Sequence, residues 1–197
     1  MIANDSYYRG DFMTLREQIE KYIPYNEQEE RDKDLMLNSM DIFDDVLTRE
    51  NQICHFTASG WVVNKQRTKV LMAFHNIYNS WAWTGGHADG EEDLCKVAIR
   101  EVSEETGVQN LTLLSDGIYS LEVLTVDGHV KKGKYVSSHL HMDCCFLFEA
   151  DEKEALRIKA DENNGVAWVD IDKAPEVTNE EKMRPIYKKL NDKLKNV

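Results

Sequence analysis

The sequence lacks the features that would mark a membrane-bound or exported protein. No hydrophobic run approaches the ~20 residues of a membrane-spanning helix. The N-terminus, MIANDSYYRGDF, has no basic region followed by an apolar run, so it does not resemble a signal peptide. These absences exclude a membrane partner and predict a cytoplasmic location.

Cysteine is also scarce, and its spacing excludes the common cysteine-based sites. The chain has 4 cysteines, and none is part of a CxxC pair. Most fall within predicted strands or a predicted helix, where a free thiol behaves as a small buried apolar group. We therefore expect Cys54, Cys95, Cys144 and Cys145 to be free thiols, mostly in the protein interior.

Positive charge is in short supply. Lysine and arginine total 24 against 36 acidic residues, which gives a net charge of −12. A protein that binds long nucleic acids needs a basic surface to neutralise phosphates, so bulk nucleic-acid binding is not expected. A small phosphorylated substrate is still compatible, because metal ions and a few basic side chains can balance its charge locally.

What is present indicates one folded domain with a helical extension. The 197 residues are 42% hydrophobic and 30% charged, which suits a globular protein with one sizeable core. We predict a main folded domain over 51–197 and an N-terminal helical appendage over 1–50. Phe12, Leu15 and Ile19 have helical spacing, and a second helix follows Pro24. The apolar stripes of these helices need a partner surface, either the main domain or a second copy in a homodimer.

The remaining hydrophobic patterns predict a sheet and a closing helix. Segments that favour strands cover 53–63, 70–74, 80–84, 117–126, 140–150 and 165–169. A helix is predicted over 179–195, interrupted or restarted near Pro185. A mixed sheet with one helix on each face would be an α/β/α sandwich.

The segment GHADGEEDLCKVAIREVSEETGV, over 86–108, carries the clearest chemical signal. Its apolar residues recur every three or four positions, which predicts an amphipathic helix that ends at Gly107. At about 100° per residue, Glu101, Glu104 and Glu105 share one edge of the apolar stripe. Three carboxylates beside a core boundary repel one another, and a divalent cation such as Mg²⁺ would relieve that repulsion.

The same segment resembles the signature of the Nudix hydrolases at every specified position. The matching residues are Gly86, Glu92, Arg100, Glu101, Val102, Glu104, Glu105, Gly107 and Val108. The motif covers 23 residues, and the flanking strands extend the resemblance over most of 53–170. The resemblance implies the α/β/α sandwich with a mixed central sheet that the strand pattern also predicts.

The resemblance further implies an enzyme that hydrolyses a diphosphate bond in a nucleoside diphosphate linked to another moiety. It implies Mg²⁺ as cofactor, with Mn²⁺ as a substitute, and a small nucleotide or other diphosphate as substrate. The metal ligands would be Glu101, Glu104 and Glu105, with the backbone carbonyl of Gly85 or Gly86. Glu101 or a glutamate outside the motif would accept the proton of the attacking water.

The other motif residues are expected to support that site. Arg100 would orient a glutamate through a charge-assisted hydrogen bond. Glu92, Gly86 and Gly107 would shape the loop and the helix end. Members of the family also add an acidic ligand from a loop before a late strand, and Glu162, six residues before Trp168, fits that position better than Asp161 as a ligand or base.

Three histidines are candidates for binding. His139 and His141 lie two apart on a predicted strand and so share a face, a pattern that can bind zinc. Because further zinc ligands have no evident source in the sequence, substrate contact or a packed polar pair is the favoured interpretation. His87 follows the double glycine, where a phosphate contact and solvent exposure are equal alternatives.

Two other functions are compatible with the resemblance. A non-catalytic nucleotide sensor would have a degraded motif, whereas this motif is complete. An isoprenoid diphosphate isomerase would need a cysteine and a glutamate near the substrate, and the Cys144-Cys145 pair lacks a matching context. The sequence does not choose among oxidised nucleoside triphosphates, ADP-ribose, dinucleoside polyphosphates and sugar nucleotides as substrates.

Overall fold

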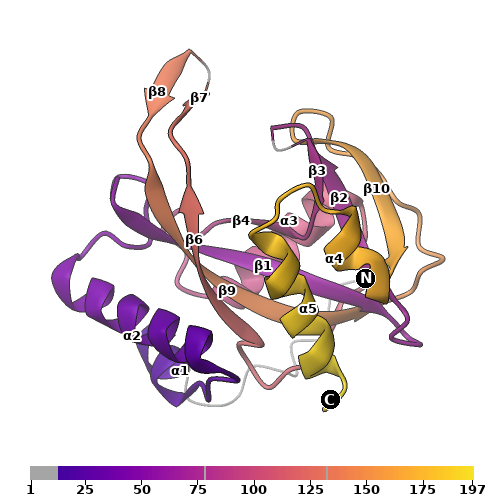
Figure 1. Ribbon diagram of the computed structural model, residues 1–197, viewed down its shortest axis with the longest axis horizontal. Coiled ribbons are helices and arrows are strands. Elements are labelled where there is room, and N and C mark those ends of the chain that lie inside the picture. The colour runs from indigo at the N-terminus through magenta and orange to yellow at the C-terminus, as the bar shows by residue number, and fades with distance from the viewer. Residues whose placement is uncertain (1–12, 78, 132) are drawn as a thin grey trace.

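A twisted, mixed β-sheet forms the centre of the protein (Figure 1). The structure is a computed structural model that describes residues 13–77, 79–131 and 133–197. Strands β1 (Cys54–Asn64) and β9 (His139–Ala150) lie side by side and parallel at its middle, with Cys54 opposite Leu140. The main path of the sheet is β10-β2-β1-β9-β5, and its other pairings are antiparallel. The remaining strands of this sheet are β2 (Lys69–His75), β3 (Ser80–Ala82), β4 (Thr84–His87), β5 (Thr112–Leu113), β6 (Ser120–Val126) and β10 (Asn163–Asp170).

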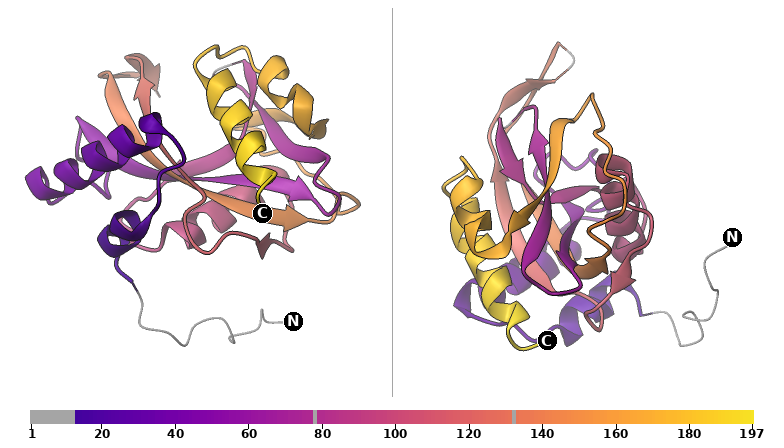
Figure 2. Two further views of the ribbon diagram at one scale, coloured as in Figure 1. Left: turned by 60° about the horizontal axis from the view of Figure 1, so that its bottom comes forward. Right: turned by 90° about the vertical axis from the view of Figure 1, so that its right-hand side faces the viewer.

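Helices cover both faces of this sheet, and Figure 2 shows the sheet between them. Helix α3 (Leu94–Thr106) packs on one face, while α4 (Ala174–Val177) and α5 (Met183–Leu194) pack on the other. The alternation of side chains along β1 supplies both layers: Phe56 and Val62 join the α3 cluster, and Trp61 joins the α5 cluster. The predicted α/β/α sandwich with a mixed sheet is confirmed.

The N-terminal helices pack on their own chain. Helix α1 (Leu15–Lys21) begins after the Thr14 cap and α2 (Glu27–Ile42) after the Asn26 cap. Leu15, Ile19 and Met36 are buried in the same cluster as the apolar face of α3. Residues 43–49, predicted as helical, instead form turns before β1, and Phe12 lies outside the described residues.

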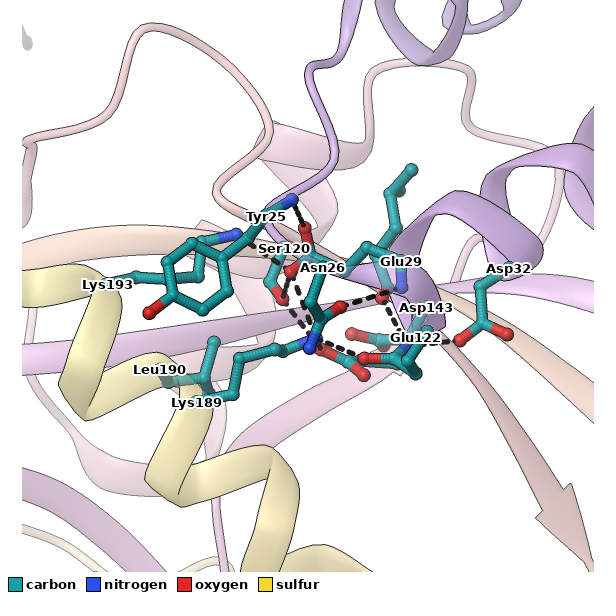
Figure 3. A network of polar contacts seen from close by, with 12 residues as sticks. Tyr25, Asn26, Glu29, Asp32, Ser120, Glu122, Asp143, Lys189, Leu190 and Lys193 are labelled. Carbon is teal, nitrogen blue, oxygen red and sulfur yellow. Dashed lines mark hydrogen bonds and ion pairs between the residues drawn. The ribbon is translucent and has the colours of Figure 1, made fainter.

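A buried ionic network, which we call the clasp, joins α2 to α5 across β6 (Figure 3). Its members are Glu29, Glu122, Lys189 and Lys193. The Nζ of Lys189 lies 3.0 Å from Glu29 and 2.5 Å from Glu122, and the Nζ of Lys193 lies 2.8 Å from Glu29. The hydroxyl of Ser120 lies within hydrogen-bonding distance of both carboxylates, between which it shares its single hydrogen. The clasp therefore connects the N-terminal and C-terminal helices through charge as well as through apolar contact.

Several segments differ in extent from the predictions. The strand expected from 117 begins at Ser120, and the loop after it contains a two-stranded hairpin of β7 (His129–Lys131) and β8 (Lys134–Val136). Helix α5 begins at Met183, which places Pro185 in the first turn, where a missing N–H breaks no helical hydrogen bond. The four cysteines are free, and three of them are buried, with Cys95 partly exposed. Across the described ranges, no helix is long and apolar enough to span a bilayer.

Candidate metal and active site

Helix α3 carries most of the signature motif and has a well-defined cap at each end. Asp93 accepts a hydrogen bond from the N–H of Lys96 at the start. Gly107 ends the helix with a φ of +84°, the left-handed conformation that glycine adopts most easily. The cap is thus supplied by Asp93, whereas Glu92, the predicted supporting residue, is exposed beside it.

The double glycine of β4 brings its backbone against two helix glutamates. A Cβ atom on Gly86 would lie 2.4 Å from the carboxyl carbon of Glu101, so only glycine allows this approach. The N–H of Gly85 donates a 2.9 Å hydrogen bond to Oε1 of Glu105. The backbone of β4 therefore packs directly against two carboxylates of helix α3.

A third carboxylate comes from a distant part of the chain. One oxygen from each of Glu101, Glu105 and Glu162 can be chosen so that all three lie within 4.8 Å of one another. Glu162 lies in the turn before β10, and this turn is tied to the end of β2 by a hydrogen bond from the N–H of Asn76 to the carbonyl of Glu162. The structure thus groups the predicted loop glutamate with two of the motif glutamates.

Burial makes this carboxylate group electrostatically unfavourable by itself. The pKa of Glu105 is raised to about 8, chiefly by burial; the Gly85 hydrogen bond opposes this shift, and the neighbouring carboxylates Glu162 and Glu101 contribute to it. Burial also raises the pKa of Glu101, against the lowering effect of Arg100. Arg100 lies 3.0 Å from Glu101 and so has the position expected for an orienting residue. A bound cation would favour the ionised forms of both glutamates.

Glu104 lies at the rim of this group. Its side chain is 48% exposed, and its Oε2 is 2.9 Å from the Nζ of Lys159. Lys159 also lies 3.0 Å from Glu162. Sequence reasoning missed Lys159, although its position three residues before Glu162, in KADE, was an available signal. This lysine fixes the turn that carries Glu162 relative to helix α3.

The predicted histidines also come together, with one that was not predicted. His139 and His141 of β9 lie beside His55 of β1, with ring centroids 4.9 Å from that of His55 in each case. The ring of His87 is 5.2 Å from His55 and 4.8 Å from His141. Burial lowers the pKa of His55. Sequence reasoning missed His55 because the parallel pairing of β1 with β9, which sets His55 opposite His141, was not predicted.

The sequence that forms this fold matches the model of a known family. The NUDIX domain model matches residues 55–190, so the chain belongs to the Nudix family. Within that family it is a Nudix-type pyrophosphohydrolase, an enzyme acting on pyrophosphate bonds.

Individual relatives agree with this assignment. An RNA pyrophosphohydrolase of Pelagibacter ubique (strain HTCC1062) is 28% identical over 143 residues, covering 70% of this chain and 90% of the relative. Among solved structures, a C. elegans Ap4A hydrolase complex is 20% identical with a TM-score of 0.55, covering 72% of this chain and 98% of the other. A NUDIX family hydrolase of Clostridium perfringens is 22% identical with a TM-score of 0.53, covering 71% and 97%. These two structures share the fold.

Proposed function

We propose that the protein is a Mg²⁺-dependent hydrolase that cleaves the diphosphate bond of a nucleoside diphosphate linked to another moiety, with Mn²⁺ as a substitute for Mg²⁺. The observation that carries this proposal is the convergence of Glu101, Glu105 and Glu162 within 4.8 Å beside the glycine backbone of β4. Such a group of carboxylates around the buried Glu105 is unfavourable without a cation, and hard oxygen ligands suit Mg²⁺.

The residues present fit such an ion. Glu101, Glu105 and Glu162 would hold it, together with Glu104 at the rim and the backbone carbonyl of Gly86 or Gly85. When bound, Mg²⁺ lowers the pKa of a coordinated water and neutralises charge on bridging phosphates. Lys159 pairs with Glu104 and Glu162, so it maintains the spacing between the helix and the loop.

The proton of the attacking water would pass to a carboxylate of this chain. We assign this role to Glu101 or Glu162, because Glu105 is held by the N–H of Gly85 and is almost fully buried. Arg100, which donates to Glu101 and more distantly to the carbonyl of His87, orients the first of these candidates. His87 directly follows Gly86 and stays our candidate for a phosphate contact, with its ring packed against His55 and His141 on the face of the sheet opposite the carboxylates.

The two alternative functions have less support. An isomerase would need an accessible cysteine, whereas Cys144 and Cys145 are buried and burial raises the pKa of both thiols. A non-catalytic sensor would not need to keep each carboxylate of the motif. The complete motif and the grouped glutamates therefore favour hydrolysis.

A substrate panel tests the proposal. Candidates are oxidised nucleoside triphosphates, ADP-ribose, dinucleoside polyphosphates, sugar nucleotides and, because a relative is an RNA pyrophosphohydrolase, an oligoribonucleotide with a 5′-triphosphate. We expect release of phosphate, pyrophosphate or a mononucleotide with Mg²⁺ or Mn²⁺ and none with excess chelator. The exposed Glu181→Gln variant serves as a control that keeps activity. Equal turnover in chelator would contradict the proposal.

A further inference from the structure

Four of the 6 histidines of the chain gather where β1, β4 and β9 meet. Alternation along β1 places His55 on the face of Trp61, which packs against α5, and its partner His141 shares that face. Gly86, which contacts Glu101, is paired with Ala58 on the α3 face instead. The histidine cluster and the carboxylate group therefore lie on opposite faces of the sheet.

Hydrogen bonds fix the protonation of two of these rings. Nδ1 of His55 lies 3.0 Å from the carbonyl oxygen of Asn51, and Nδ1 of His139 lies 2.8 Å from that of Ser137. Since a carbonyl oxygen only accepts, each Nδ1 must carry the hydrogen, and each Nε2 is left with a lone pair. Metal-binding histidines are oriented in this way, through a backbone carbonyl on the nitrogen that does not bind the metal.

The lone pair on Nε2 of His55 accepts no hydrogen bond from the residues that the structure describes. His55 is only 4% exposed, and its Nε2 is a buried atom for which those residues provide no hydrogen-bond partner. Leaving a buried polar atom unsatisfied costs free energy, and such an atom in a native fold calls for an explanation. A cation at the centre of the cluster would satisfy this nitrogen.

The distances between the ring nitrogens are close to the distances between two nitrogen ligands of one metal ion. Nε2 of His139 and Nε2 of His141 lie 3.1 Å apart and form a hydrogen bond, which a cation bound to both nitrogens would replace. Two imidazole nitrogens on a tetrahedral zinc ion are about 3.3 Å apart, given Zn–N bonds of about 2.0–2.1 Å. Ring nitrogens of His55, His139 and His141 all lie within 4.8 Å of one another. A side-chain movement of about 1.5 Å would therefore bring even two nitrogens 4.8 Å apart to the N···N distance of a tetrahedral zinc ion.

We propose that His55, His139 and His141 form a second metal site, one that binds a borderline divalent cation of the zinc class. Imidazole ligands suit Zn²⁺, whereas carboxylate and carbonyl ligands suit Mg²⁺, so the two faces of the sheet select different ions. Three protein ligands leave a fourth position of a tetrahedral ion for water or another donor. His87 lies outside the group of three nitrogens, and we assign it no ligand role. This site does not depend on the hydrolase function.

Cobalt absorption tests the site, because Co²⁺ replaces Zn²⁺ at histidine ligands and absorbs visible light strongly when it is four-coordinate. The full chain, freed of metal by chelator, is titrated with Co²⁺ in excess Mg²⁺, which occupies the carboxylates. We expect visible absorption that saturates at one equivalent and is lost when Zn²⁺ is added. Absence of that absorption in the wild-type protein overturns the proposal.

Variants locate the bound ion. His55→Ala, His139→Ala and His141→Ala should each weaken Co²⁺ binding about 100-fold or more, since even changes to outer partners of a ligand cost 10–100-fold. His129→Ala removes a histidine outside the group and should bind as the wild type does, as should Glu105→Gln. The partly exposed His139 and His141 serve as the test if replacement of the buried His55 prevents folding. Unchanged binding in both of their variants, or loss of absorption only in Glu105→Gln, would overturn the proposal.

Discussion

The clasp and the carboxylate site are both buried or half-buried ionic clusters, but they differ in charge balance. The clasp pairs Glu29 and Glu122 with Lys189 and Lys193, and none of these four side chains is more than 11% exposed. The carboxylate site gathers Glu101, Glu104, Glu105 and Glu162 around Lys159 and Arg100. The first cluster is neutral and closed, and the second retains a negative excess that a divalent cation can balance.

The pKa values of two glutamates express this difference. Burial tends to raise the pKa of both. At Glu29, Lys189, Lys193 and hydrogen bonds from Tyr22 and Tyr25 overcome burial and lower it to about 2. At Glu105, neighbouring carboxylates act in the same direction as burial, and the pKa rises to about 8. A buried glutamate is therefore stabilised in its charged form where cations surround it, whereas among other carboxylates its charge needs a bound cation, as the proposed function supplies.

The largest expected effect is the loss of turnover on neutralising the carboxylate site. Glu105→Gln and Glu104→Gln remove charge that would balance the cation, so we expect kcat/KM to fall about 1,000-fold or more, at a factor of ten per 1.4 kcal/mol. Because Gln is close in shape to Glu, the thermal midpoint should not decrease. Activity assays and thermal unfolding check this, and full activity in both variants would contradict the assignment of the site.

A substitution in the clasp should lower stability and leave turnover unchanged. Lys189→Met leaves two buried carboxylates with less compensation, and breaking such a pair costs about 3–5 kcal/mol of unfolding free energy. We expect kcat with Mg²⁺ to stay at the wild-type value below the unfolding transition. Urea denaturation measures the loss, with the exposed Lys188→Met as the matched control on the same helix. If Lys189→Met lost activity without losing stability, the clasp would not have the purely structural role that distinguishes it from the carboxylate site.

A smaller effect is expected from displacing one carboxylate. Ala at position 86 would place Cβ 2.4 Å from the Glu101 carboxyl carbon, so the side chain has to move. A displacement of about 1 Å at a reacting centre costs about 100-fold in rate, and we expect Gly86→Ala to lose that much kcat/KM. Gly165→Ala, whose Cβ would meet only ordinary contacts from 3.4 Å, is the control. Equal rates in the two variants would argue against the role of Glu101.

The smallest expected effect is a pH dependence of Mg²⁺ binding. Below a pKa of about 8, Glu105 of the metal-free protein is protonated, and the cation has to displace that proton. The apparent affinity should therefore rise with pH, by up to about tenfold per unit between pH 6 and 8, and level off above. Calorimetry in buffers of different ionisation enthalpy measures the released proton. Glu105→Gln should abolish the release, and an affinity that falls with rising pH would contradict this account.

Local patterns predicted the parts of the site that depend on sequence spacing. The helix that carries Glu101 and Glu105 followed from its periodicity, and Glu162 followed from the family resemblance, applied to the loop six residues before Trp168. His55, the clasp and the contact of Lys159 with Glu104 did not follow, because each depends on segments brought together by the fold. Lys189 and Glu29 lie 160 positions apart in the sequence, and the contact of His55 with His141 depends on the parallel pairing of β1 with β9.

The central claim is that the carboxylate site binds a divalent cation, whereas the more deeply buried, charge-balanced clasp does not. Mn²⁺ binding to the chelator-treated protein, measured by electron paramagnetic resonance, tests it most directly. We predict that Mn²⁺ competed by Mg²⁺ is bound by the wild type and by Lys189→Met, and that this binding is lost in Glu105→Gln. Retention of Mg²⁺-competed Mn²⁺ binding in Glu105→Gln would contradict the account.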